Sequence, residues 1–153
     1  MAGNWNNPAM PYKIPVSVLV VIHTPDLQVL LLERADHPGY WQSVTGSCDP
    51  GETPWQTAIR EVGEETGLDA AQYLLADWNR TYEFEIFPEW RHRYGPGVTH
   101  NTEHVFGLRL PSPLPVSLSP REHLAYRWLP WEAAAEAVFS WTNAAAIREL
   151  PLR

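Results

Sequence analysis

One segment in the first half of the chain carries local signals that fix where a helix begins and ends. Thr53 is a typical helix N-cap, and Pro54 after it suits the first helical position. Gln56, three residues after Thr53, completes a capping-box pattern. Gly67 suits the left-handed position just past a helix C-terminus. The sequence therefore predicts a helix over residues 54–66.

The predicted helix carries an apolar face and a cluster of carboxylates. Glu61, Glu64 and Glu65 are centred roughly 110–120° around the helix from the apolar stripe. Like charges three or four residues apart on a helix destabilise it. Two interpretations follow: a solvated acidic face, or oxygen ligands for a hard cation such as Mg²⁺, with Arg60 placed to orient one carboxylate. The apolar stripe comprises Trp55, Ala58, Ile59 and Val62.

Strand and helix signals are mixed along the rest of the chain. A dense run of β-branched residues predicts a buried strand over residues 14–23, and the turn signal at Pro25-Asp26 predicts a returning strand over residues 28–34. Strands mixed with two or three helices favour an α/β or α+β sandwich. Further strands are predicted over residues 42–45, 80–87, 102–110 and 124–129, and helices over residues 130–139 and 143–150.

Length and composition limit the possible functions. With 153 residues, we expect one domain over residues 14–150 after a loose N-terminal arm over residues 1–13. Eleven basic against eighteen acidic residues give a net charge of −7, which disfavours a general nucleic-acid binder. The longest apolar stretch, residues 16–22, is far shorter than the ~20 residues that span a bilayer. The single cysteine, Cys48, suits a reducing compartment, so we expect a cytoplasmic protein without nucleic-acid or membrane partners.

The spacing of glycine, glutamate and arginine residues around the predicted helix resembles a known motif. Residues 46–68 read GSCDPGETPWQTAIREVGEETGL. This resembles the Nudix box: Gly, five residues, Glu, seven residues, then Arg-Glu-aliphatic-x-Glu-Glu-x-Gly-aliphatic, with every specified position filled. The resemblance implies an α/β fold, a Nudix-type α/β/α sandwich with a mixed β-sheet. It also implies metal-dependent hydrolysis of a diphosphate bond.

The same resemblance assigns roles to individual residues. Glu61 and Glu65 match metal ligands, Glu64 matches a ligand or the base that activates water, and Arg60 matches the residue that orients these carboxylates. Glu122 resembles the carboxylate beyond the box that completes a site for Mg²⁺, with Mn²⁺ as a possible substitute. Metal ions neutralise the charge of the phosphates and lower the pKa of a bound water. Three residues match structural positions of the box: Gly46, Glu52 and Gly67.

Stretches outside the box resemble a group of folate-pathway Nudix enzymes, the bacterial dihydroneopterin triphosphate diphosphatases. The likeness covers nearly all of residues 12–147, including YWQSVTGS at residues 40–47. It implies removal of pyrophosphate from dihydroneopterin triphosphate, a small-molecule substrate, by a monomer or weak homodimer. The substrate-binding positions that it implies are Lys13, Arg34, Thr45, Phe84, Glu85, Ile86, Phe87 and Ser140.

Several of these residues also have plain structural interpretations. Lys13 and Arg34 are placed to offset a triphosphate, but they are equally strand-end charges. Glu122, without the resemblance, is a solvated loop carboxylate. Phe84 and Ile86 alternate with acidic residues and predict a buried strand face.

Other features leave alternatives open. The basic and aromatic run at residues 91–94 suits terminal phosphates or a solvated loop. His100 and His104 have zinc spacing only on a helix, and their surroundings indicate a strand. Trp41 and Trp90 are candidates to stack on a flat pterin ring.

Two other functions compete with the leading one. The first is a general nucleoside triphosphate pyrophosphatase of the same fold. The second is a non-catalytic Nudix-fold module that binds nucleotides, which the intact box disfavours.

Overall fold

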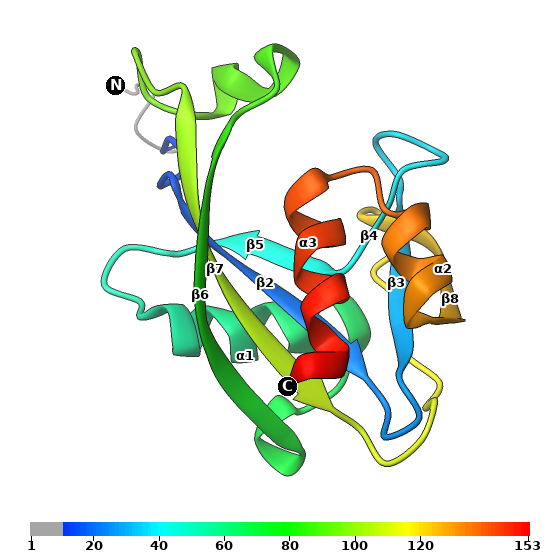
Figure 1. The fold of residues 1–153 in the computed structure, drawn as a ribbon. Coiled ribbons are helices and arrows are strands. Elements are labelled where there is room, and N and C mark those ends of the chain that lie inside the picture. Colours follow the sequence, from blue (N-terminus) through cyan, green and yellow to red (C-terminus); the bar gives the residue numbers. More distant parts are fainter. Residues whose placement is uncertain (1–10) are drawn as a thin grey trace.

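A mixed β-sheet with helices on both faces forms the framework of the protein (Figure 1). The computed structural model describes residues 11–153; residues 1–10, which make up most of the predicted arm, lie outside the described residues. No helix within the described residues is long and apolar enough to cross a membrane. The strands are β2 (Val16–His23), β3 (Gln28–Arg34), β4 (Trp41–Gln42), β5 (Val44–Ser47), β6 (Leu74–Glu85), β7 (His100–Arg109) and β8 (His123–Pro130). The helices are α1 (Pro54–Thr66), α2 (Trp131–Ala137) and α3 (Trp141–Glu149), with 3₁₀ turns η1 (Ala70–Gln72), η2 (Pro88–Arg93) and η3 (Leu150–Leu152).

Strand β2 organises the sheet by pairing with three other strands. It runs parallel to β7 over its whole length, from Val16 opposite Thr102 to His23 opposite Arg109. It runs antiparallel to β5 and, at its end, to β3. Strand β3 continues antiparallel to β4 and β8, and β6 pairs antiparallel with β7. One parallel pair among antiparallel neighbours makes the sheet mixed.

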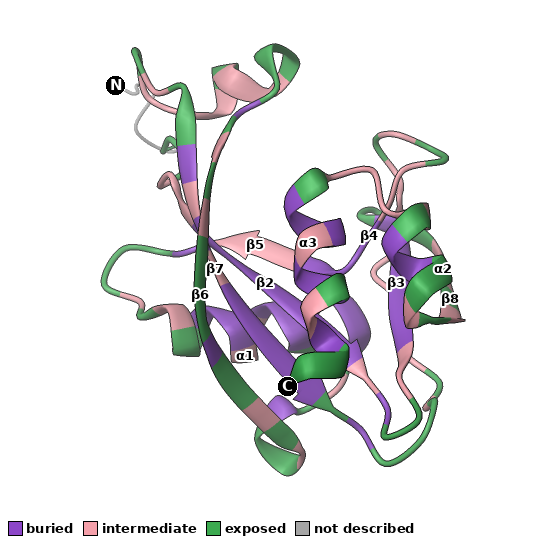
Figure 2. Cartoon of the chain, in the orientation of Figure 1, coloured by how far each residue is buried: buried purple, intermediate pink, exposed green. Residues whose placement is uncertain are grey.

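Two apolar clusters hold the helices against opposite faces of the sheet (Figure 2). On one face, Ala58 and Val62 of α1 pack on the cluster that contains Val18 and Phe106. On the other face, α2 and α3 pack on a cluster that contains Leu19, Val21 and Val105. Alternate residues of β2 enter both clusters because successive side chains of a strand point to opposite faces. This arrangement is the α/β/α sandwich expected from the sequence.

Helix α1 begins and ends where the local signals place it. Thr53 Oγ1 accepts a hydrogen bond from the Gln56 amide at 3.1 Å, and the Thr53 amide donates to Gln56 Oε1 at 2.9 Å. Gly67 takes a left-handed conformation with φ of 76°. Trp55 differs from expectation: it remains 44% exposed and meets Phe106 only at its edge, with ring centroids 6.0 Å apart. The first turn of α1 therefore lies at the margin of the core.

Two strands differ most from their predicted bounds. The strand expected over residues 80–87 begins six residues earlier, at Leu74, and ends at Glu85. The strand expected over residues 42–45 is divided at Ser43, whose amide donates to Asn143 Oδ1 at 2.8 Å. In both cases the cause is pairing with a distant segment, which the local pattern does not contain.

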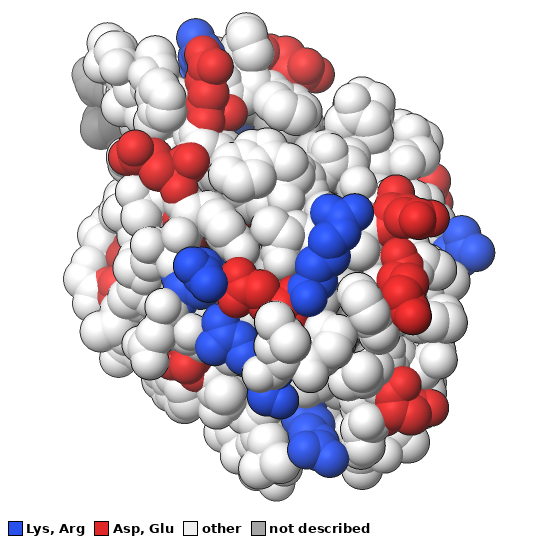
Figure 3. All heavy atoms as spheres, viewed as in Figure 1, with Lys and Arg blue, Asp and Glu red and all other residues white. Residues whose placement is uncertain are grey.

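The face that carries α3 and the adjoining part of β6 shows charges of both signs side by side (Figure 3). Glu149 forms ion pairs with Arg80 of β6 and with Arg153, both at 2.9 Å. The Tyr82 hydroxyl also donates to Glu149 at 3.1 Å. These contacts tie the last helix to the edge strand of the sheet.

Candidate active site

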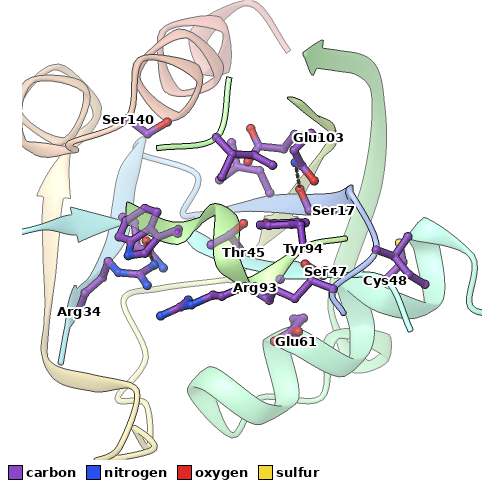
Figure 4. Close-up of a pocket in the computed structure, with 18 of the residues that line it drawn as sticks. Ser17, Arg34, Thr45, Ser47, Cys48, Glu61, Arg93, Tyr94, Glu103 and Ser140 are labelled. Carbon is purple, nitrogen blue, oxygen red and sulfur yellow. Dashed lines mark hydrogen bonds between the residues drawn. The ribbon is translucent and has the colours of Figure 1, made fainter. Parts of the chain in front are cut away.

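A cavity of about 950 Å³ opens at the end of the sheet where β2 and β7 begin and β6 ends (Figure 4). Helix α1, η2, the turn before β8 and the start of α3 complete its walls. Glu52 and Gly67, expected to have structural roles, are not part of the lining. The lining includes the remaining residues to which the resemblance assigns a role: Lys13, Arg34, Thr45, Gly46, Arg60, Glu61, Glu64, Glu65, Phe84, Glu85, Ile86, Phe87, Glu122 and Ser140.

Arg60 connects the carboxylates of the box with one another. Its Nε and Nη2 atoms donate to the two carboxylate oxygens of Glu52 at 2.8 and 2.9 Å. Its Nη1 atom donates to Glu61 at 3.1 Å, and Nη2 also donates to the Ser47 carbonyl oxygen at 3.0 Å. The hydrogen bonds from Arg60 lower the pKa of Glu52 to about 2. Arg60 therefore fixes α1 to the loop that precedes it and sets the orientation of Glu61.

Glu61 and Glu65 are buried, with only 9% and 2% of their surface exposed. Burial raises the pKa of both carboxyl groups, and the charge of Glu61 raises the pKa of Glu65 further. Among residues 11–153, Glu65 Oε1 has no hydrogen-bond partner. His123 Nε2 lies 3.6 Å away, but burial lowers the pKa of His123 to about 4, so it is neutral at pH 7. Only Glu64, with half its side chain exposed, matches the interpretation of a solvated acidic face.

These two buried carboxylates fit a hard divalent cation. Such ions take oxygen ligands, and a cation supplies the charge that the pair lacks. Glu122, in the turn before β8, lines the same cavity, and its charge also raises the pKa of Glu65. Glu64 is turned toward Arg60 at 3.3 Å, and within the described part of the chain no three acidic, histidine or cysteine side chains yet surround a common point.

Gly46 provides the space in which the Glu61 carboxylate lies. A Cβ atom at position 46 would overlap that carboxylate. Glycine is therefore required by the close approach between β5 and α1.

Aromatic rings form another wall of the cavity. Phe87 stacks on Trp90 with ring centroids 5.1 Å apart, and Phe139 meets both rings edge-on. Trp41, the other tryptophan nominated from the sequence, does not line the cavity; Arg127 lies over its ring at 5.5 Å. Trp90 and Phe87 therefore supply a flat apolar surface beside the box.

Three basic residues accompany these rings. The Arg34 guanidinium lies 4.7 Å from the Trp90 ring centroid and donates two 2.7 Å hydrogen bonds to Asp36. Figure 4 shows the side chains of Arg34 and Arg93 extending toward each other. The Lys13 amide donates to the Arg93 carbonyl at 2.8 Å, and burial, together with the charge of Arg93, lowers the pKa of Lys13. An acidic protein thus concentrates positive charge on one wall of the cavity.

The basic run at residues 91–94 is divided between two roles. Arg93 and Tyr94 line the cavity. Arg91 instead pairs with Glu85 at 2.5 Å and donates to the Ile86 carbonyl at 2.9 Å. Only the second half of the run is therefore available to a ligand.

The two histidines with zinc-like spacing lie on β7. Residues four apart on a strand are separated by roughly 13 Å, so His100 and His104 cannot ligate one ion. This agrees with the strand favoured for them from the sequence.

Two buried polar residues of β7 that line the cavity escaped the sequence reasoning. Glu103 and Asn101 lie on β7 and are 5% and 2% exposed. A signal was present, because both share a strand face with Val105 of the core. A carboxylate on the buried face of a strand is unusual and points to a ligand or a partner.

The comparisons with known proteins identify the family. The NUDIX domain model matches residues 13–150. The chain belongs to the Nudix family. This family is one of typically divalent-metal-dependent hydrolases, and the fold and family expected from the sequence are confirmed.

Two similar relatives share one description. The chain is 53% identical to the dihydroneopterin triphosphate diphosphatase of Escherichia coli K12, over 90% of this chain and 93% of that protein. It is 46% identical to the Haemophilus influenzae protein of the same description, over 92% of this chain and 89% of that protein. The structure of the E. coli dihydroneopterin triphosphate pyrophosphohydrolase superposes with a TM-score of 0.85, covering 90% of this chain and 95% of that one.

Proposed function

We propose that this Nudix protein is a dihydroneopterin triphosphate diphosphatase, which releases pyrophosphate and dihydroneopterin monophosphate in folate biosynthesis. The observation that carries the proposal is 53% identity to the E. coli enzyme over nine tenths of the chain. The cavity supports it, because one space holds a carboxylate cluster, a basic wall and a flat aromatic wall. These are the features that a triphosphate joined to a planar ring requires.

The metal in this proposal is Mg²⁺, with Mn²⁺ as a substitute. Glu61, Glu65 and Glu122 would hold it, and Glu64 either joins them or accepts the proton of the attacking water. When bound, such an ion neutralises phosphate charge and lowers the pKa of its water. Arg60 keeps Glu61 in place throughout, because it is itself fixed by the bidentate contact with Glu52.

The basic wall binds the phosphates in this proposal. Lys13, Arg34 and Arg93 offset the negative charge of the triphosphate, which the overall charge of −7 would otherwise repel. The aromatic surfaces of Phe84 and Phe87 face the same cavity and suit a flat heterocycle.

Release of pyrophosphate and orthophosphate, with and without Mg²⁺, tests the proposal. Dihydroneopterin triphosphate and the common nucleoside triphosphates are compared in parallel. We expect Mg²⁺-dependent pyrophosphate release that is fastest from the pterin compound. Equal or faster release from nucleotides would favour the general pyrophosphatase, and binding without hydrolysis would favour the non-catalytic module.

A variant of the box tests the metal site in the same assay. We expect Glu65→Gln to lose turnover while remaining folded, because it removes a buried negative charge that the cation needs. Glu132→Gln, at an exposed position of α2, is the charge-matched control and retains activity. Unchanged hydrolysis by Glu65→Gln would overturn the assignment of the metal site.

We also propose that residues 14–150 form one domain and that the enzyme is a cytoplasmic monomer or weak homodimer. Limited proteolysis with mass spectrometry tests the first point: one resistant core of that length is expected. Light scattering across a concentration series tests the oligomeric state.

A further inference from the structure

A buried carboxylate outside the Nudix box lines the same cavity. Glu103 lies on β7, in register with Ser17 of β2 and Tyr82 of β6, and only 5% of its surface is exposed. Figure 4 places Glu103 across the cavity from Glu61. Glu103 therefore belongs to a different part of the cavity from the metal site.

The oxygens around Glu103 are not fully used by the protein. Among residues 11–153, Glu103 Oε1 and Asn101 Oδ1 are buried without a hydrogen-bond partner. The Asn101 amide nitrogen donates to Ser17 Oγ at 2.7 Å, which leaves its oxygen free. Thr142 of α3 provides the hydrogen bond to the Glu103 carboxylate. Buried acceptors without donors destabilise a fold, so two of them on the same face of β7 indicate a ligand that brings donors.

Resting on the proposed function, we propose that Glu103, with Asn101 beside it, is the specificity determinant for the substrate ring. It recognises the edge on which an exocyclic amino group lies next to a ring N–H group. A carboxylate accepts two such parallel hydrogen bonds, as it does from an arginine side chain. The 2-amino-4-oxo ring of a pterin presents this edge, and so does guanine. Adenine and cytosine present an amino group beside an acceptor, and uracil has no amino group.

The position of Glu103 agrees with this role. Glu61 and the basic residues Arg34 and Arg93 lie on other sides of the cavity from Glu103 (Figure 4). A triphosphate at the box therefore leaves its ring free to extend toward β7. The ligand class is therefore a triphosphate of a 2-amino-4-oxo heterocycle, in which the ring as well as the phosphates determines binding.

The unmodified protein provides the first test. GTP and ITP differ only in the 2-amino group of the base, so their inhibition constants against hydrolysis of dihydroneopterin triphosphate isolate that group. We expect GTP to bind about tenfold or more tightly than ITP, as for one hydrogen bond to a charged acceptor. ITP should resemble ATP more closely than it resembles GTP. Equal inhibition by GTP and ITP would overturn the inference.

The second test is Glu103→Gln, which keeps the size of the side chain and replaces an acceptor with a donor. We expect kcat/KM for dihydroneopterin triphosphate to fall about 10- to 100-fold, mainly through KM. The inhibition constant of ATP should stay unchanged and the preference for GTP over ITP should disappear. A loss that is equal for all ligands would overturn the inference, since it would indicate a structural or catalytic role.

A control and a comparison keep the outcomes separate. Glu83→Gln makes the same charge change on β6, at an exposed position outside the cavity lining, and should leave all constants unchanged. If the unmodified protein does not hydrolyse the pterin compound, the proposed function fails. If it does, and Glu103→Gln keeps its selectivity, only the present inference fails.

Discussion

The carboxyl group of Glu103 should make the stability of the protein depend on pH. Burial raises its pKa from 4.5 to about 7, and the hydrogen bond from Thr142 offsets only part of this increase. Between pH 4.5 and 7 the group ionises in the unfolded chain while it stays protonated in the folded one. Stability therefore falls as pH rises, by about 1.4 kcal/mol per pH unit. The loss is absent below pH 4.5 and complete above pH 7.

Glu103→Gln should remove this dependence, because the amide resembles the protonated carboxyl group and does not titrate. From the two pKa values, ionisation destabilises the folded protein by about 1 kcal/mol at pH 5 and by about 3 kcal/mol at pH 8. The free energy of unfolding of the variant, relative to the unmodified protein, should therefore rise by about 2–3 kcal/mol between these pH values. In thermal unfolding this corresponds to about 5–10 °C. Glu61 and Glu65 titrate in both proteins, so their contributions cancel in the comparison.

Urea unfolding at several values between pH 5 and pH 8, in buffer with a chelator, measures this difference. Glu83→Gln serves as the control and should follow the unmodified protein at every pH, because Glu83 is exposed. If the free energies of Glu103→Gln and the unmodified protein run parallel from pH 5 to pH 8, Glu103 is not a buried acid with a raised pKa. That result would also argue against Glu103 as a buried acceptor that lacks hydrogen-bond donors.

Three further substitutions probe the frame of the box. Gly46→Ala should lower kcat/KM by about 100-fold, since its methyl group displaces the Glu61 carboxylate; activity like that of the unmodified protein would show that the close approach is unimportant. Arg60→Lys should lower the melting temperature by about 3–6 °C, because lysine cannot reproduce the bidentate contact with Glu52, and calorimetry measures this. Thr53→Ala should destabilise the protein by about 1 kcal/mol through loss of the N-cap, and its kinetic constants should stay unchanged. In urea unfolding, we expect a lower midpoint with an unchanged slope.

Elements whose signals lie within a few residues were predicted from the sequence with accurate bounds. The caps of α1 are contained in Thr53, Gln56 and Gly67, and strand β3 has the bounds that the turn before it predicts. Strand β6 was predicted poorly at its start. Residues 74–79 do not alternate, the register shifts between Asp77 and Arg80, and the segment is held by pairing with β7. Such long-range pairing is not visible in a local pattern.

The residues of the candidate site also divide into those with a local sequence signal and those without one. The box residues stand at fixed offsets on one helix and its loop, so the sequence was enough to group Glu61, Glu64 and Glu65. The substrate positions were grouped by resemblance, and the structure places them around one cavity, where their roles remain proposals. Glu103 and Asn101 were missed because the strand face that they share with Val105 was not recognised as buried, which the sheet then shows it to be.

Three buried carboxylates with raised pKa values, Glu61, Glu65 and Glu103, face the same cavity. Each destabilises the ligand-free protein, and the two apolar clusters on either side of the sheet offset that loss. A cation at the box and a donor edge at Glu103 would each relieve part of it, so each ligand should stabilise the fold. The carboxylates project from α1 and β7, which are packed elements, and they are buried in the ligand-free protein. The unfavourable burial of these carboxylates is thus the physical source of selectivity. A ligand that brings no positive charge to the box, or no N–H donors to Glu103, leaves the cost of that burial uncompensated.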